Sequence, residues 1–214
     1  PIQINAPSAL IRLVYIDDVV HRFISIMDGA ITNGQFCNVD PIYEITVGSL
    51  VDKLNLFKNS RESLLIEQVG TGLDRALYST YLSYLKPEQF SYDLVKHVDP
   101  RGQFTEMLKT NDSGQISYFT AHPGITRGGH YHHSKNEKFL VVKGSALFKF
   151  RHVVTNDYYE LRVTSEHPAV VETVPGWTHD ITNIGDDEMI VMLWSNELFD
   201  RAAPDTFTKA LQVT

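Results

Sequence analysis

One stretch of the chain, residues 124–144 with the sequence GITRGGHYHHSKNEKFLVVKG, constrains the fold more than any other. His130 and His132 are two residues apart, so on a β-strand their side chains leave the same face. Glu137 follows after enough residues for a tight turn onto a neighbouring strand, and His179 lies far along the chain. Three imidazoles and a carboxylate suit a first-row divalent metal, and we expect zinc first. The alternative is a set of ordinary polar residues in a solvent-lined barrel mouth.

The texture of the sequence changes near residues 88–96, where we place the boundary between a domain at 1–90 and a domain at 91–214. From Phe90 onward, short alternating runs are broken by Gly, Pro, Asn and Asp, which is typical of an all-β domain. Runs at intervals of about eight to twelve residues indicate a sandwich or small barrel. The candidate strands are FTEML, QISYFTA, KFLVVKG, SALFKFRHV, YYELRVTS, AVVETV, HDITNIG and EMIVMLWSN.

The first 90 residues are α/β in character. Residues 11–16 predict a buried strand, followed by a helix that starts at Asp17 or Asp18 and runs to Gly29. Residues 34–39 predict a second strand, and a further strand enters a helix capped near Thr46. The run LYSTYLSYL predicts another helix.

Composition excludes several classes of protein. A net charge of −7 argues against non-specific nucleic-acid binding, which needs a basic surface. Cys37 is the only cysteine, so no intrachain disulfide and no cysteine-based zinc site can form, which fits a cytoplasmic protein. No apolar run approaches the roughly 20 residues of a membrane span. The sequence starts without Met, and we expect it to begin partway through a longer protein.

The spacing of the histidine-rich stretch resembles the cupin family. Gly124, His130, His132, Glu137 and Gly144 match the first cupin motif in full. The second motif is mostly present as Gly176, His179 and Asn183, although Pro175 directly precedes the glycine where the family usually has one residue between them. The resemblance implies a jelly-roll barrel that holds a divalent metal. The same four ligands can also hold iron, as in an oxygen-dependent dioxygenase.

Two flanking pieces resemble dTDP-sugar 3,5-epimerases. HVDPRGQFTEMLK (97–109) follows the pattern D-x-R-G-x-F-x-E, and RGGHY (127–131) follows R-G-x-H-aromatic. The resemblance implies that Arg101, Arg127 and Glu106 contact substrate. It also implies that His130 removes a proton α to a C4 ketone. Arg101 has a second interpretation as a structural ion-pair partner.

The resemblance leaves the lysine, the proton donor and the role of His130 open. Lys138 lies one position short of the active-site lysine of those epimerases, and Trp194 stands where they tend to have a tyrosine acid, so the proton donor is unassigned. His130 is claimed for two roles, because an imidazole whose lone pair ligates a metal cannot also accept a proton. Either the metal is structural or Lewis-acidic and another group is the base, or His130 is the base and the metal is weak or absent.

Over nearly all its length the chain resembles the C-terminal portion of bifunctional capsular polysaccharide synthesis enzymes of the CapF type. LVYIDDVV and YEITVGSLVDKL are similar to the substrate-binding part of an extended short-chain reductase, here without its nucleotide-binding half. The resemblance implies C3 epimerisation of a UDP-4-keto-6-deoxy-hexulose by the cupin, followed in the full-length enzyme by NADPH-dependent C4 reduction. It also implies a homodimer. A non-catalytic metal-binding cupin that serves dimerisation or sugar binding is the alternative.

No reductase activity is expected from this chain as given. A Gly-rich turn that would place a helix N-terminus against a pyrophosphate does not occur near its start. Tyr92 and Lys96 have the reductase Tyr-x-x-x-Lys spacing, but they lie at the entry to the β region, where a catalytic helix is implausible.

Overall fold

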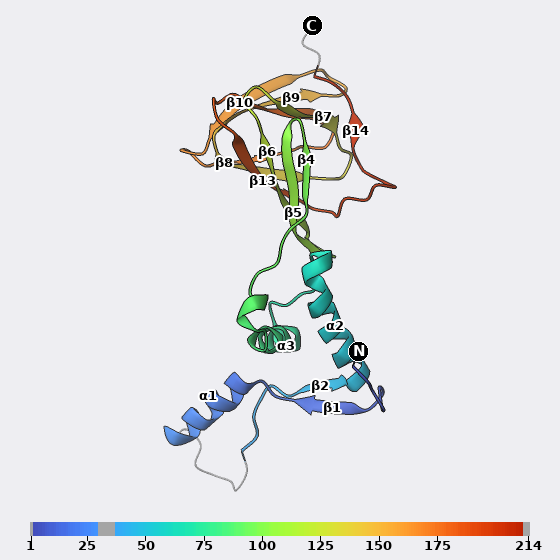
Figure 1. Ribbon diagram of the computed structural model, residues 1–214, viewed down its shortest axis with the longest axis vertical. Helices are drawn as coiled ribbons and strands as arrows, with labels where there is room; N and C mark the ends of the chain where they lie inside the picture. Colours follow the sequence, from blue (N-terminus) through green and yellow to red (C-terminus); the bar gives the residue numbers. More distant parts are fainter. Residues whose placement is uncertain (1, 30–36, 212–214) are drawn as a thin grey trace. The chain divides into compact units, whose positions relative to one another are not determined.

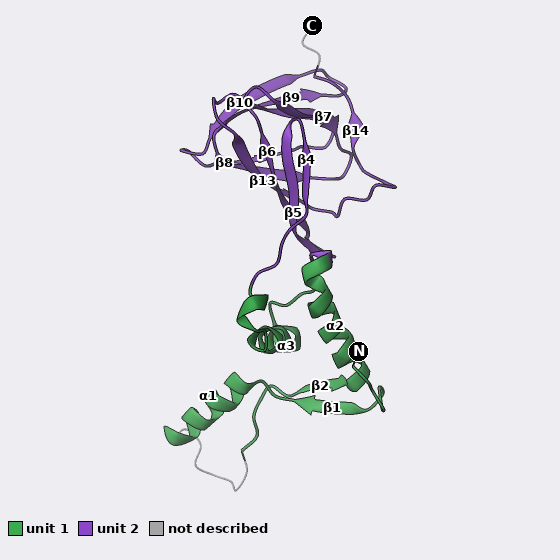
Figure 2. Cartoon of the chain, in the orientation of Figure 1, with its two compact units in different colours: residues 1–62, 67–90 green, residues 63–66, 91–214 purple. Residues whose placement is uncertain are grey.

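The computed structural model describes residues 2–29 and 37–211 (Figure 1). The chain divides into two compact units (Figure 2). Unit 1 comprises Pro1–Glu62 and Glu67–Phe90, and unit 2 comprises Ser63–Ile66 and Ser91–Thr214. In the described ranges, no helix is long and apolar enough to cross a membrane.

Unit 1 contains a two-stranded antiparallel sheet and its helices. Its elements are β1 (Leu10–Leu13), α1 (Ile16–Met27), β2 (Tyr43–Thr46), α2 (Val47–Ser63), α3 (Gly72–Ser83) and the 3-10 turn η1 (Pro87–Gln89). The start of α2 follows from Thr46, whose Oγ1 accepts the Ser49 N–H at 3.2 Å, as an N-cap does. Phe57 is buried against the rings of Tyr78 and Tyr81 and anchors α2 to α3.

The helices predicted in unit 1 are present with different bounds. The first strand is Leu10–Leu13, and the prediction that it is buried is wrong, because its residues alternate between exposed and half-buried. The strand predicted at 34–39 lies partly outside the described residues, and residues 37–39 are not in a strand. None of the residues of α1 is buried, although Val20, Phe23, Ile24 and Met27 give it an apolar face.

Unit 2 is a β-sandwich of two sheets, and among its described residues every strand pair except β3 with β5 is antiparallel. One sheet has the order β10-β9-β12-β7-β14, and the other has the order β11-β8-β13-β6-β5-β3, with β4 paired to β5. The strands are β3 (Leu65–Ile66), β4 (Lys96–Asp99), β5 (Gly102–Thr110), β6 (Gly114–Ala121), β7 (Thr126–Tyr131), β8 (Glu137–Lys143), β9 (Ser145–His152), β10 (Tyr158–Thr164), β11 (Val170–Glu172), β12 (Trp177–Asn183), β13 (Met189–Ser195) and β14 (Phe207–Thr208).

Alternation along the strands builds the core between the sheets. Phe148 and Phe150 on β9 point inward, as do Phe139 and Val141 on β8, while the residues between them face outward or are less buried. The predicted all-β jelly-roll is confirmed, and all eight predicted runs contain strands. Strands β3, β4 and β14 were not among the predicted runs, and neither was β7, in which Gly128 and Gly129 interrupt the alternation.

A candidate metal centre

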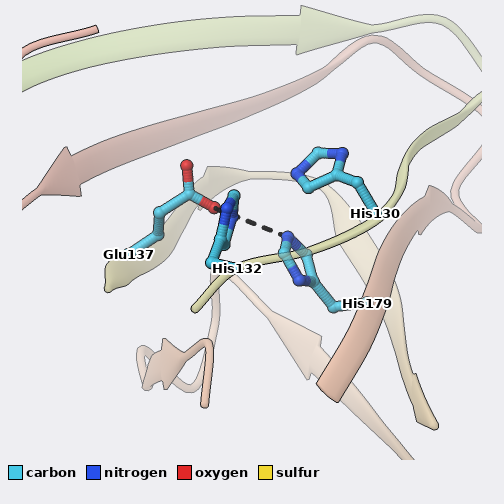
Figure 3. A group of neighbouring side chains, drawn as sticks. All are labelled: His130, His132, Glu137 and His179. Atoms are coloured by element: carbon cyan, nitrogen blue, oxygen red, sulfur yellow. Dashed lines mark hydrogen bonds and ion pairs between the residues drawn. The ribbon is translucent and has the colours of Figure 1, made fainter. Parts of the chain in front are cut away.

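Four side chains carried by the two sheets of unit 2 lie next to one another (Figure 3). His130 comes from β7, His132 from just beyond it, Glu137 from the start of β8 and His179 from β12. One donor atom from each lies within 4.8 Å of the others, and all but His130 are buried. The grouping expected from the motif spacing is therefore present in the structure.

An extra residue in β7 decides which side chains face this group. His179 pairs with His130, but Asp180 pairs with Gly128, so Gly129 is looped out as a β-bulge. In an unbroken strand, residues three apart face opposite sides. The bulge brings Arg127 and His130 to the same inner face, and the positive φ of Gly128 and Gly129 explains the glycine pair. A Cβ on Gly128 would also lie 2.7 Å from the carbonyl oxygen of His179.

Glu137 is at the centre of the group. Its Oε2 lies 3.2 Å from Nε2 of His132 and 3.5 Å from Nε2 of His179, and its Oε1 lies 3.2 Å from Nζ of Lys135. Burial acts to raise the pKa of Glu137, but the contacts with His132 and His179 and the charge of Lys135 lower it well below its usual range. The group is therefore a carboxylate.

The donor set fits a divalent cation. Nδ1 of His132 lies 2.5 Å from the main-chain oxygen of Asp205, and since a carbonyl only accepts, Nδ1 carries the proton. Nε2 then faces the carboxylate of Glu137, where it carries either a second imidazole proton or the lone pair of a metal ligand. In the neutral imidazole two buried lone pairs would face each other, and this arrangement calls for a cation between them. His132, His179 and Glu137 would be its ligands, a set that suits zinc.

His130 differs from its three neighbours. Its ring lies 5.0 Å from that of His132 and 4.6 Å from that of His179, yet among the described residues its nitrogens make no hydrogen bond. Burial, reinforced by the nearby His179, lowers the pKa of His130 to about 4. At neutral pH this imidazole is neutral, and it lines two cavities.

The first of these, the arginine cavity, has a volume of about 220 Å³. It is lined by Arg101, Arg127 and His130 among apolar side chains that include Phe104 and Phe119. Arg127 donates from Nε to the Thr120 carbonyl at 3.0 Å, while its buried Nη2 lacks a hydrogen-bond partner. Such an unpaired donor favours an anionic or carbonyl ligand in this cavity.

Arg101 is an ion-pair partner, which is one of the two roles expected for it, and its contact with substrate stays a prediction. Its guanidinium contacts both oxygens of Asp99, at 3.3 Å from Nε to Oδ1 and 2.5 Å from Nη2 to Oδ2. The hydrogen bonds from Arg101 lower the pKa of Asp99 to about 2. Arg101 also lines the arginine cavity, where about half of its side chain is exposed.

The second, the lysine cavity, has a volume of about 300 Å³ and adjoins His130 and Glu137. Glu106 lines it and forms an ion pair with Lys109 at 2.8 Å. Lys135 lines it too, with only 12% of its side chain exposed. The sequence analysis did not identify Lys135, because it lies in the turn before β8, where strand alternation says nothing about the direction of a side chain.

The structure does not bring Lys138 to this group. Lys138 follows the inward Glu137 on β8 and therefore faces outward, where its ammonium pairs with Glu172 and lies over the ring of Trp194. Trp194 faces outward for the same reason and donates from Nε1 to the Ser113 carbonyl at 2.9 Å. Strand parity, rather than closeness in sequence, separates both residues from the site.

Comparison with known proteins gives the following relatives. Residues 97–207 match the family model described as Polysaccharide biosynthesis C-terminal domain. The chain is 62% identical over 207 residues to a UDP-2-acetamido-2,6-beta-L-arabino-hexul-4-ose reductase from Pseudomonas aeruginosa, a match that covers 97% of this chain and 56% of the relative. A crystal structure of the capsular polysaccharide assembling protein CapF from Staphylococcus aureus matches with a TM-score of 0.93 at 41% identity, covering 99% of this chain and 57% of that one.

A second CapF structure, with the inhibitor 3-isopropenyl-tropolone, gives the same TM-score and identity and is covered to 61%. The expected resemblance to CapF-type enzymes is confirmed. The chain spans rather more than half the length of these relatives.

Proposed function

The chain belongs to the polysaccharide biosynthesis C-terminal domain family, and from this membership we propose that unit 2 epimerises C3 of a UDP-4-keto-6-deoxy-hexulose of the 2-acetamido-2,6-dideoxy type. The Pseudomonas relative is named for a UDP-linked hexul-4-ose, a sugar in which the C4 ketone makes the neighbouring C3 proton acidic. The observation that carries the proposal is a neutral imidazole, His130, that lines one cavity with the unpaired guanidinium N–H of Arg127.

His130 is the base in this proposal. It lines both cavities and makes no hydrogen bond within the described part of the chain, so a ring nitrogen is free to take the C3 proton. The contacts of Glu137 with His132 and His179 leave these three residues as metal ligands without His130. This division removes the conflict between the roles of ligand and base.

Negative charge that develops on the C4 oxygen needs a cation close by. Arg127 can donate its Nη2–H to that oxygen, because no described residue accepts a hydrogen bond from Nη2, and Oδ1 of Asp99 lies 4.0 Å away. A bound divalent metal would act as a Lewis acid on the same carbonyl. A proton delivered to the opposite face of C3 then completes the inversion.

The nucleotide lies toward Arg101 in this arrangement. Arg101 is half exposed at the arginine cavity, and a guanidinium there suits the diphosphate of a UDP-sugar. Glu106 lines the lysine cavity and is assigned to the sugar hydroxyls.

We assign unit 1 to the C-terminal part of a reductase that uses NADPH to reduce C4 in the complete enzyme, in the synthesis of a UDP-N-acetyl-L-fucosamine precursor. The apolar face of α1, which carries no buried residue, supports packing against further protein. The predicted homodimer stays a prediction.

Deuterium exchange tests the epimerase directly. The chain, loaded with zinc, is incubated with the UDP-4-keto sugar in D₂O, and NMR should find deuterium at C3. His130→Ala should abolish exchange while retaining one zinc per chain. Loss of zinc from this variant would make His130 a ligand instead of the base. Absence of exchange in folded, zinc-loaded wild type would leave a non-catalytic cupin.

A further inference from the structure

We propose that Asp205 is a positioning residue that fixes both the ring of His132 and the turn leading to Glu137. Its main-chain oxygen and its carboxylate act on two different parts of the candidate metal centre. The inference rests on the metal site of the proposed function, but it does not depend on the epimerase reaction.

The carboxylate of Asp205 gathers three consecutive backbone N–H groups. Its Oδ1 accepts from His133 at 3.0 Å, and its Oδ2 accepts from His133 at 3.2 Å, from Ser134 at 2.7 Å and from Lys135 at 2.8 Å. The hydroxyl of Ser134 donates to Oδ2 as well, at 3.1 Å. Charge-assisted bonds of this kind are stronger than neutral ones, so one side chain holds the whole first half of the turn.

The main-chain oxygen of Asp205 fixes the ligand. It accepts the Nδ1–H of His132 at 2.5 Å, which fixes the tautomer and points the Nε2 lone pair at Glu137. A hydrogen bond to the second ring nitrogen is how proteins orient metal-binding histidines. His132 is 1% exposed, so water cannot take the place of this acceptor.

Asp205 is itself held by the adjacent strand β14. Phe207 pairs with Tyr131 of β7 and stacks on its ring, with centroids 5.4 Å apart. The ring of Phe207 also meets His133 at 4.5 Å, and Lys209 donates its N–H to the Gly129 carbonyl at 2.9 Å. The segment around Asp205, some 70 residues after His132 in the sequence, is thus fixed to β7, the strand that carries His130.

The second half of the turn has braces of its own. The Asn136 N–H donates to Oδ1 of Asn196 at 2.9 Å, and the Glu137 N–H donates to Oγ1 of Thr173 at 2.9 Å. Removal of the Asp205 carboxylate should therefore loosen residues 133–135 and the ring of His132 without unfolding β8. This expectation makes a selective effect on the metal testable.

Zinc binding to the whole chain is measured by competition with a chromophoric chelator for wild type, Asp205→Ala, Asp205→Asn and Asp200→Ala. Asp200 is the matched control, because it is an exposed carboxylate of the same segment that, among the residues the structure describes, accepts only from the nearby Ala202 N–H, at 2.8 Å. We expect Asp205→Ala to bind zinc about 10–100-fold more weakly. Asp205→Asn, which keeps one acceptor oxygen, should recover part of the loss, and Asp200→Ala should match wild type.

Two spectra separate positioning from a general loss of stability. Cobalt(II)-loaded Asp205→Ala should show an altered d–d spectrum, while its circular dichroism equals that of wild type. Nitrogen NMR of the zinc-free wild type should show His132 protonated at Nδ1, and in Asp205→Ala this signature should weaken.

Wild-type zinc affinity and an unchanged cobalt spectrum in folded Asp205→Ala would overturn the proposal, as would a His132 in zinc-free wild type that is protonated at Nε2 and not at Nδ1. Normal zinc binding without C3 exchange would instead overturn the proposed reaction and leave the role of Asp205 intact.

Discussion

The ammonium of Lys135 lies 3.2 Å from Oε1 of Glu137, while the other oxygen of the same carboxylate faces His132 and His179. Glu137 thus divides its two oxygens between a fixed protein cation and the candidate metal position. Lys135 is mostly buried and also lies 5.9 Å from the ring centre of Phe199. A cation held in this way costs little reorganisation when charge develops on a bound substrate.

Replacement of that cation should impair turnover more than metal binding. We expect Lys135→Met, which keeps the length of the side chain, to lower the rate of C3 exchange by about 100-fold. Zinc content should stay at one per chain, because Lys135 is no ligand and its loss removes a repulsion from the metal. Lys138→Met is the matched control and should behave as wild type, since Lys138 faces outward toward Glu172. Equal effects of the two variants would remove Lys135 from the site.

The planar fork of Arg127 should be needed for substrate binding. Arg127→Lys keeps the positive charge but loses the planar guanidinium. In wild type, Nε of this group donates to the Thr120 carbonyl, while Nη2 has no hydrogen-bond partner among the described residues. We expect kcat/KM for the UDP-sugar to fall roughly 10–100-fold, as for a lost hydrogen bond to a charged group. Arg162→Lys, on the exposed face of β10, is the control. An unchanged kcat/KM in Arg127→Lys would contradict this role.

The pH dependence of stability follows from His130. Its pKa is about 4 in the folded chain and near 6.5 when unfolded, so between these values the unfolded chain binds more protons. The contribution of His130 to the free energy of unfolding is complete above pH 6.5 and is lost as the pH falls toward 4. Urea denaturation in EDTA at pH 7.5, 6 and 5 should show this decline. The His130→Gln variant should lose less stability between pH 7.5 and pH 5. An equal loss in both proteins would contradict the lowered pKa of His130.

Two glycines with nearly the same φ provide a paired test of packing. Gly114 and Gly124 have φ of +74° and +75°, but a Cβ on Gly114 would lie 1.7 Å from the Ser195 carbonyl oxygen, whereas one on Gly124 meets nothing within 4 Å. Gly124→Ala should cost about 1 kcal/mol of stability through backbone strain alone. Gly114→Ala should cost about 1–3 kcal/mol more, because β6 and the end of β13 must separate. Thermal denaturation of both variants measures the difference.

Much of unit 2 could be predicted from its sequence because alternation and spacing are local properties. The eight runs that were named contain strands, and the spacing of His130, His132 and Glu137 indicated their convergence. The helix start at Thr46 was visible for the same reason, since a cap acts over three residues.

What could not be predicted depends on pairing across the chain. Asp205 reaches the turn at 133–135 only because β14 pairs with β7, and no local pattern marks such a pairing. Lys138 was proposed because it lies close to a family position, whereas Lys135 belongs to the turn before β8 and reaches Glu137 only through the fold of that turn. The bulge at Gly129 is visible only in the register between β7 and β12.

That bulge makes the site sensitive to the number of residues in β7 as well as to their kinds. A chain with one glycine fewer between Arg127 and His130 would keep every side chain of the candidate centre, yet its arginine would turn to the solvent. A sequence comparison that scores only matched residues would find every site residue present in such a chain. In this family, the number of residues between the arginine and the histidine should therefore be compared before the arginine is assigned to substrate binding.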